Sequence, residues 1–186
     1  MTTHRVCPWW IGYLLASPLR RWLQDPAQIA GAYADPGMII LEPGPGMGFF
    51  TLELARLAGP TGRVVAVDVQ PKMLDVLRRR AARKGLAERI DARVAEAASM
   101  GVGDLAGTVD LVWAFAVVHE LPDAAGFFGE ASAALKQGGK LLLVEPTGHV
   151  DVVEFERELR LAAAAGLEVR ERPAIRRSRA ALLRKW

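Results

Sequence analysis

From about residue 38 onward, short apolar runs of β-type residues alternate with longer helical stretches. Residues 64–67 are apolar without alternation, and so are residues 141–144. Strands that are apolar on both sides are typical of sheets covered by helices on both faces. The sequence therefore predicts repeated βαβ units around a buried, mostly parallel sheet, which is the pattern of an α/β fold.

Five strands and four helices are expected in this region, followed by a terminal hairpin. The strands are residues 38–42, 63–68, 89–94, 109–115 and 140–145, and the helices are residues 49–57, 71–84, 124–135 and 152–165. The hairpin strands are residues 167–173 and 178–183. Pro71 suits a first helical turn, and Gly85, Gly138 and Gly166 suit helix ends. The pattern predicts five βα repeats and then two strands.

Composition indicates one compact core. The chain has 186 residues, 51% of them apolar and 24% charged, which excludes disordered and collagen-like classes. Cys7 is the only cysteine, which excludes an internal disulfide and favours a reducing, cytoplasmic location. No apolar run reaches the roughly 20 residues of a membrane span. The net charge is only +3, but basic residues are concentrated at positions 170–185. They either bind phosphate or keep the edge of the expected hairpin from pairing with another chain.

A glycine-rich loop follows the first expected strand. Residues 42–48 read Glu-Pro-Gly-Pro-Gly-Met-Gly and run directly into a helical stretch. Glycines permit backbone conformations closed to other residues and leave room for a ligand, although glycine and proline also form ordinary turns. The second strand ends at Asp68, about 20 residues beyond Gly48, where a Rossmann-like unit places a carboxylate against ribose hydroxyls. The two features together predict a nucleoside site.

The loop suits a cation better than a pyrophosphate. Its spacing is G-x-G-x-G, and Phe49 and Thr51 follow where a dinucleotide loop needs a later glycine. Glu42, directly before the glycines, would repel a phosphate and attract a positive group. A nucleoside with a positively charged head group is therefore expected.

Residues 41–48 resemble the first motif of the class I S-adenosylmethionine-dependent methyltransferases, particularly the small-molecule-type core domain, and residues 65–68 resemble the second. Residues 134–146 resemble the family's passage from helix to fifth strand, with Gln137 where proline is usual. The resemblance covers roughly residues 38 to 184. It implies a Rossmann-like three-layer sandwich, with a seven-stranded, mostly parallel sheet whose last strand is antiparallel, and S-adenosyl-L-methionine as cofactor.

The resemblance also implies how this cofactor is held. The glycine loop would wrap its methionine part, Glu42 would lie near its amino group, and Asp68 would hold its ribose. Glu96 stands where the family usually has an aspartate that contacts the adenine amino group. The complete expected set is Glu42, Gly44, Pro45, Gly46, Gly48, Asp68, Val69, Gln70, Met73, Glu96, Ala97 and Ala114.

His119 is the candidate catalytic base. It follows the fourth strand, and ligands bind beyond the carboxyl ends of parallel strands. A neutral histidine there would take a proton from a hydroxyl or amine acceptor; the alternative is a capping or packing histidine. His149, His4 and Cys7 would face the same cleft and suit a thiol or metalloid acceptor, or they are unconnected surface residues. The several cysteines of arsenite-methylating relatives are missing, and no metal site is expected.

Residues 1–37 are expected to form a separate helical segment before a core domain of residues 38–186. In the resembled family such helices often cover the substrate, so Trp9, Trp10 and Tyr13 would line the acceptor pocket together with His119 and His149. The alternatives are that the aromatic residues only pack on the sheet, or that they contact a membrane surface beside Arg20 and Arg21.

The sequence thus predicts methyl transfer to a small-molecule acceptor through an oxygen, nitrogen or sulfur nucleophile. RNA or protein methylation remains an alternative. An NAD(P)-dependent oxidoreductase and a non-catalytic cofactor-binding protein are alternatives of other classes. DNA is not expected as a substrate, because no Asp/Asn-Pro-Pro-aromatic segment follows the fourth strand and no Pro-Cys nucleophile occurs. A monomer or a homodimer is expected.

Overall fold

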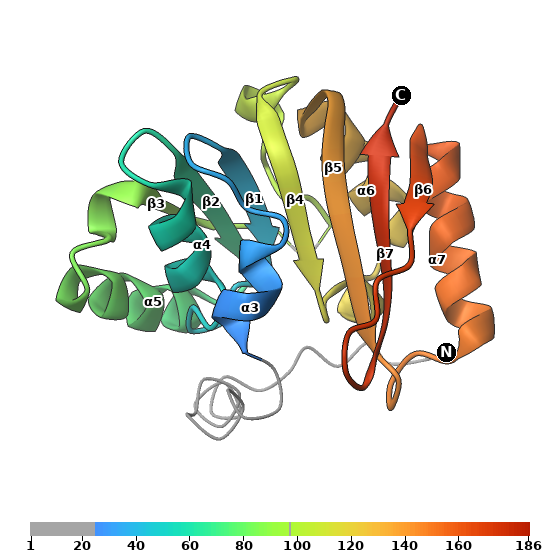
Figure 1. Cartoon of the computed structure of the whole chain (residues 1–186), viewed down its shortest axis with the longest axis horizontal. Helices are drawn as coiled ribbons and strands as arrows, with labels where there is room; N and C mark the ends of the chain where they lie inside the picture. The colour runs from blue at the N-terminus through green and yellow to red at the C-terminus, as the bar shows by residue number, and fades with distance from the viewer. Residues whose placement is uncertain (1–24, 97) are drawn as a thin grey trace. The chain divides into compact units, whose positions relative to one another are not determined.

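A computed structural model describes residues 25–96 and 98–186. Seven strands form one sheet in the order β3-β2-β1-β4-β5-β7-β6 (Figure 1). Their bounds are β1 Ile39–Pro43, β2 Arg63–Asp68, β3 Ile90–Val94, β4 Val109–Phe115, β5 Leu135–Pro146, β6 Leu167–Glu171 and β7 Ser178–Lys185. β2 is parallel to β1 and β3, β5 is parallel to β4, and β7 is antiparallel to β5 and β6. The predicted α/β, Rossmann-like class with an antiparallel last strand is confirmed.

Helices alternate with most of the strands. They are α3 Pro26–Gly31, α4 Thr51–Ala58, α5 Pro71–Arg83, α6 Ala124–Ala134 and α7 Val152–Ala164, with the short 3-10 turns η1 Ala87–Arg89, η2 Gly103–Leu105 and η3 Val118–Glu120. Pro71 lies in the first turn of α5, as predicted. The predicted fifth βα repeat is wrong: in the described residues between β3 and β4, the only helical element is η2. Three glycines between residues 101 and 107 disfavour a longer helix there.

Gly138 was expected at a helix end, and this prediction is wrong. α6 ends at Ala134, and Leu135 already has the extended backbone that starts β5. Gly138 lies within β5 at a positive φ of 76°, in the stretch where the register between β4 and β5 shifts from Val109 to Leu111. Glycine therefore permits an irregularity within a strand here, which is a common use of the residue.

The described residues fall into two compact units, residues 25–95 and residues 96–186 apart from residue 97. In the first unit, α4 contacts β1 and β2, and α5 contacts β2 and β3. The strand residues 64–66 and the helix residues Leu54, Leu74 and Leu77 are all fully buried. The unalternating apolar run of β2 therefore has the buried environment that the sequence predicted. The division of the chain at residue 37 stays a prediction.

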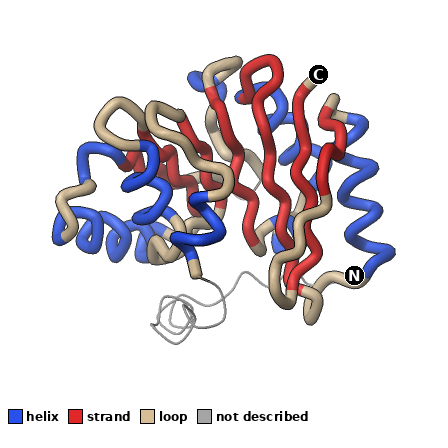
Figure 2. The backbone as a smooth tube through the Cα atoms, in the orientation of Figure 1, coloured by secondary structure: helices blue, strands red, loops and turns tan. Residues whose placement is uncertain are grey.

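The second unit contains β4 to β7 with α6 and α7. Residues 141–144 of β5 are fully buried, as are Trp113 of β4 and Phe128 of α6. α7 contacts both α6 and β6, and β7 lies between β5 and the edge strand β6 (Figure 2). The strands at the centre of this unit are thus apolar on both sides, and the hairpin predicted from residue 167 onward is present.

Several cations of the C-terminal segment have partners within the chain. The Lys185 ammonium donates to the carbonyl oxygens of Ser132 and Leu135, at 2.6 and 2.9 Å. The Arg184 guanidinium donates to the Gly138 carbonyl at 3.2 Å, and Arg172 pairs with Glu156. Lys185 therefore satisfies carbonyl groups at the end of α6, where a cation is also favoured by the helix dipole.

We expect Lys185→Ala to lower the free energy of unfolding by about 1.5 kcal/mol, because it removes two charge-assisted hydrogen bonds to a helix end. Urea unfolding measures the effect. The matched control is Arg170→Ala, which removes only an exposed pair with Glu168 and should cost well under about 1 kcal/mol. Equal losses in the two variants would show that Lys185 does not stabilise the end of α6.

Candidate functional site: a glycine loop and a buried histidine cluster

The loop after β1 depends on glycine at several positions. Gly44, Gly46 and Gly48 have φ values of 64°, 53° and 83°, in the left-handed region that disfavours other residues. A side-chain carbon at Gly48 would collide with Leu77 Cδ1 of α5, whereas one at Gly46 would meet no atom within 4 Å. Gly48 thus allows the loop to pack against α5, and Gly46 leaves open space beside the backbone.

Asp68, at the end of β2, holds this loop. Its Oδ2 accepts a hydrogen bond from the Gly46 amide at 3.3 Å, and its Oδ1 accepts one from the Gln70 amide at 2.9 Å. The side chain is buried, and the Gly44 amide donates to the Val67 carbonyl at 2.9 Å. The two features that the sequence analysis combined, the glycine loop and the carboxylate, are therefore joined directly.

Glu42 of the first unit is a buried carboxyl group with a raised pKa. It is only 3% exposed, and neither its Oε2 nor the hydroxyl of Thr51 has a hydrogen-bond partner among the described residues. Burial raises the pKa of Glu42 to about 8, with a further contribution from the charge of Asp68, although Thr51 opposes the shift. A buried carboxyl oxygen without a partner is costly. A ligand with a cationic N–H group would satisfy it, so this site fits the amino group of S-adenosylmethionine.

Arg80 of α5 was missed by the sequence analysis. Its Nη1 donates to the carbonyl oxygen of Met47, in the middle of the glycine loop. Arg80 follows Leu77 by three positions, so both side chains lie on the helix face toward the loop. That spacing was visible in the sequence, but α5 is rich in arginine, and no feature of the neighbouring sequence distinguishes Arg80 from the other arginines.

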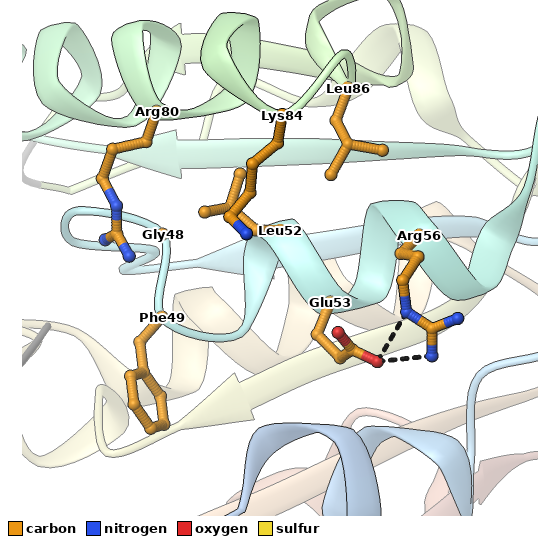
Figure 3. A pocket seen from close by; sticks show the side chains of 8 residues that line it. All are labelled: Gly48, Phe49, Leu52, Glu53, Arg56, Arg80, Lys84 and Leu86. Atoms are coloured by element: carbon orange, nitrogen blue, oxygen red, sulfur yellow. Dashed lines mark hydrogen bonds and ion pairs between the residues drawn. The ribbon is translucent and has the colours of Figure 1, made fainter. Parts of the chain in front are cut away.

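A cavity of about 220 Å³ lies beside Arg80, between α4 and α5 (Figure 3). Its lining residues are Gly48, Phe49, Leu52, Glu53, Arg56, Arg80, Lys84 and Leu86. Glu53 and Arg56 pair with each other across one turn of α4, at 2.6 Å. Gly48 is the only lining residue that belongs to the predicted cofactor set, so this cavity is not the predicted nucleoside site.

The remaining predicted cofactor residues have varied environments. Met73 is 4% exposed, Val69 is 37% exposed, and Gln70 is the residue that precedes α5. Glu96 is exposed and its backbone forms an isolated bridge with Ser99, whereas Ala114 is fully buried within β4. Pro45 is buried in the loop. Ala97 lies outside the described residues.

His119 lies in η3, directly after β4, and is a partly buried residue of the second unit. Its Nδ1 bonds to Oε2 of Glu145, and Oε1 of Glu145 accepts a hydrogen bond from the Val118 amide at 2.8 Å. Glu145 is fully buried at the end of β5. Ala116 has a positive φ of 57°, so a strained turn leads from β4 to His119. The ring of His149 packs edge-on against that of His119, with centroids 5.3 Å apart.

The second unit contains another buried acid. Glu158 of α7 is 1% exposed, and its Oε2 has no hydrogen-bond partner among the described residues. Burial raises the pKa of Glu158 to about 8, and the charges of Glu145 and Glu154 add to the shift. Burial alone would lower the pKa of His119, but the hydrogen bond and charge of Glu145 raise it above its ordinary value.

The sequence predicted His119 and His149 as site residues, but it did not predict Glu145 or Glu158. Glu158 occupies the apolar stripe of α7, next to Leu159 and three residues after Phe155, and both of these are buried. An acid within such a stripe was the available signal. His4, Cys7, Trp9, Trp10 and Tyr13 lie outside the described residues.

The described residues were searched for metal-binding side-chain groups and for helices that could span a membrane. No three histidine, cysteine, aspartate or glutamate side chains among residues 25–96 and 98–186 gather in a way that could hold a metal ion. In the same part of the chain, every helix is too short or too polar to cross a membrane.

Comparison with known proteins identifies the family. Residues 41–143 match the model of a methyltransferase domain. An arsenite methyltransferase of Halobacterium salinarum is 29% identical over 70% of this chain and 34% of its own length. A ubiquinone/menaquinone biosynthesis C-methyltransferase, UbiE, of Hydrogenovibrio crunogenus is 29% identical over 68% of this chain and 48% of its own. This chain thus spans about a third to a half of the length of these relatives.

The fold has close structural counterparts as well. A crystal structure of a SAM-dependent methyltransferase from Aquifex aeolicus superposes with a TM-score of 0.85, at 22% identity, over 97% of this chain and 100% of that one. The matched family model covers more than half of the chain, so this chain belongs to the methyltransferase domain family. It is a class I domain of the S-adenosylmethionine-dependent type, as the resemblance of its first two motifs implied.

Proposed function

We propose that this chain catalyses methyl transfer from S-adenosylmethionine to a small-molecule acceptor with an oxygen, nitrogen or sulfur nucleophile. The observation that carries the proposal is the buried Glu42 carboxyl, whose Oε2 has no hydrogen-bond partner among the described residues, beside a glycine loop that Asp68 holds in place. The arsenite methyltransferase and the UbiE C-methyltransferase of ubiquinone/menaquinone biosynthesis have names that support a small-molecule acceptor, although neither name supports an oxygen, nitrogen or sulfur nucleophile.

Residues of the first unit would bind the cofactor. The backbone of residues 44–48 would contact its methionine part, the Glu42 carboxylate would accept from its amino group, and the Asp68 carboxylate would accept from the ribose hydroxyls. When bound, the cofactor supplies an electrophilic methyl group on a positively charged sulfur. Much of the acceleration of such a displacement comes from holding the reacting atoms in line.

His119 would serve as the proton acceptor for a hydroxyl, thiol or amine substrate. Because its Nδ1 bonds to Glu145, Nε2 is the nitrogen left for the acceptor. A positioned base of this kind contributes typically about 10² to 10⁴ to a rate. Trp9, Trp10, Tyr13 and His149 remain proposed acceptor contacts.

Two alternatives are disfavoured by particular residues. A nicotinamide dinucleotide would bring a pyrophosphate to a loop that begins at the acidic Glu42 and lacks the later glycine. Arsenite would bind best to several thiols, whereas Cys7 is the only cysteine of this sequence. RNA and protein acceptors remain alternatives that a screen of acceptors would distinguish.

Calorimetric titration with S-adenosylhomocysteine and, separately, with NADH tests the cofactor. We expect S-adenosylhomocysteine to bind and NADH to bind at least about a hundredfold more weakly, because only the first has an ammonium group for Glu42. Tight binding of NADH with weak binding of S-adenosylhomocysteine would overturn the proposal.

The affinity for S-adenosylhomocysteine should rise with pH between about pH 6 and 8. Glu42 is neutral below its raised pKa of about 8, and the ligand's ammonium group favours the ionised form. Binding therefore requires loss of a proton, so affinity increases by up to about tenfold per pH unit until Glu42 is ionised. Calorimetry in buffers of different ionisation enthalpy at pH 7 should detect the released proton. Glu42→Gln should bind more weakly and lose both the pH dependence and the proton release; a persistent pH dependence would assign it to another group.

Arg80→Ala should weaken binding of S-adenosylhomocysteine about fivefold, because a hydrogen bond worth roughly 1 kcal/mol no longer fixes the Met47 carbonyl of the loop. The matched control is Arg79→Ala on the same helix. Arg79 donates only to the Asp75 carbonyl of its own helix, at 3.1 Å, and its removal should leave the affinity unchanged. The same loss in both variants would point to a general effect of charge.

A further inference from the structure

The cavity between α4 and α5 is separate from the proposed cofactor and acceptor sites, and Gly48 is the only residue that it shares with them. Its volume is about 220 Å³, and all of its lining residues belong to the first compact unit. Sites for drug-sized ligands have volumes of roughly 300 to 1,000 Å³. This α4–α5 cavity therefore suits a smaller ligand.

One part of the cavity wall is apolar. Leu52 of α4 and Leu86, which follows α5, are only 7% and 9% exposed, and Phe49 before α4 is half-buried. Contact between such side chains and an apolar part of a ligand is favourable, because it removes both surfaces from water. The cavity can therefore hold the apolar body of a small molecule.

The rest of the wall has an excess of positive charge. Three cations, Arg56, Arg80 and Lys84, line the cavity. Glu53 is the only acid among the described lining residues, and it already pairs with Arg56 at 2.6 Å. The charge of a bound anion would thus be attracted to the side of the cavity formed by α5.

Arg80 and Lys84 lie on the same side of α5, because residues four positions apart on a helix are neighbours. Figure 3 shows both side chains extending from α5 toward α4 and the loop before it. The helix dipole favours basic residues at the end of α5, but it does not explain why two of them line one cavity. Like charges at this spacing repel each other, and an anion between them would remove the repulsion.

We propose that the α4–α5 cavity binds a small carboxylate with an apolar body. Arg80 and Lys84 would donate hydrogen bonds to the carboxylate group. Leu52, Leu86 and Phe49 would contact the apolar body. A carboxylate suits this site because its two oxygens match the planar guanidinium group, which can donate to both of them. The existence of this site does not rest on the proposed function.

Arg80 connects the cavity to the glycine loop. Its Nη1 donates to the Met47 carbonyl, and a guanidinium group has five N–H donors, so it can bond to this carbonyl and to an anion at the same time. An anion that fixes Arg80 would therefore stabilise the loop in its present conformation. Because the proposed cofactor contacts the same loop, carboxylate and cofactor should each raise the affinity for the other. This consequence rests on the proposed function.

The test of the site is an NMR titration of the full chain with benzoate, followed by the backbone amide resonances. We expect saturable shifts at residues 48–53 and 80–86. Acetate has the same carboxylate but almost no apolar body, so it should bind at least about tenfold more weakly. Inorganic phosphate also lacks an apolar body and should bind more weakly than benzoate.

Lys84→Ala tests the proposed contact with the carboxylate. It should weaken benzoate binding about fivefold, which is the upper range for an ion pair at an exposed lysine. Arg83→Ala is the matched control. Arg83 is adjacent, exposed and equally charged, but it does not line the cavity, so its removal should leave the affinity for benzoate unchanged.

Three results would overturn the carboxylate site. Shifts that do not saturate, or that occur only in the second unit, would show that benzoate does not occupy the cavity. Equal losses of affinity in Lys84→Ala and Arg83→Ala would show an effect of net charge alone. Acetate or inorganic phosphate that binds as tightly as benzoate would show that the apolar wall does not contribute.

The connection to the glycine loop has a separate measurement. Saturating benzoate should raise the affinity for S-adenosylhomocysteine about two- to threefold in calorimetry, and this effect should disappear in Arg80→Ala. An affinity that bound benzoate leaves unchanged or lowers would overturn the connection. Failure to bind S-adenosylhomocysteine at all would remove the proposed function and leave the benzoate titration unaffected.

Discussion

Replacing Asp68 with alanine is expected to weaken the binding of S-adenosylhomocysteine at least about tenfold, and about a hundredfold if both of its proposed functions are lost. A charge-assisted hydrogen bond is worth about 1.5–3 kcal/mol, and 1.4 kcal/mol corresponds to a factor of ten in affinity. Asp68 accepts from the amides of Gly46 and Gln70, so the variant loses the loop's anchor as well as the proposed ribose contact.

Two further variants separate these contributions. Asp68→Asn keeps one carbonyl acceptor but loses the charge, so it should bind with an affinity between those of the alanine variant and the unmodified chain. Asp75→Ala removes an exposed aspartate of α5 that pairs with Arg78, and it should bind normally. Calorimetry measures all three. Unchanged affinity in Asp68→Ala would show that this residue does not contribute to the nucleoside site.

The glycine loop and Asp68 could be predicted from the sequence because their requirements are local. Backbone at positive φ strongly favours glycine, whatever the rest of the chain does, and Gly44, Gly46 and Gly48 all have this conformation. The strand with residues 64–67 could be predicted for a similar reason, since a short run rich in valine and apolar without alternation is typical of a buried strand.

The sequence predictions failed for features that depend on contacts between residues far apart in the chain. Gly138 follows a helix in the sequence and was assigned to its end, but its positive φ serves a register shift between β4 and β5. No local pattern distinguishes these uses of glycine. Arg80 was missed for the same reason: its bond to the Met47 carbonyl joins residues 33 positions apart, and its neighbours on α5 include other arginines.

The sequence pattern marks Glu145 and Glu158 as unusual acids at core positions, but it does not show what stabilises them there. Both acids interrupt apolar sequences, one after the strand residues 141–144 and the other within the buried stripe of α7. A charged residue at a core position indicates either a partner or a proton. Which of these applies depends on donors from other elements, here the Val118 amide and His119, and a single sequence does not place them.

His119→Gln is expected to lower the rate of methyl transfer by about 10² to 10⁴ and to leave the affinity for S-adenosylhomocysteine unchanged, because the proposed base acts on the acceptor's proton and makes no cofactor contact. The measurement is transfer of a labelled methyl group from S-adenosylmethionine to a panel of phenols, thiols and amines. The control is Glu156→Gln in α7, which removes a partly exposed acid that pairs with Arg172 and should retain full activity.

The dependence of methyl-transfer activity on pH provides a second test of His119 as the base. A base must be neutral to act, and Glu145 raises the pKa of His119. Activity in the unmodified chain should therefore fall as pH decreases through this raised pKa. Full activity in His119→Gln would exclude His119 as the base, and an acid limb that persists unchanged in His119→Gln would assign the limiting proton to another group.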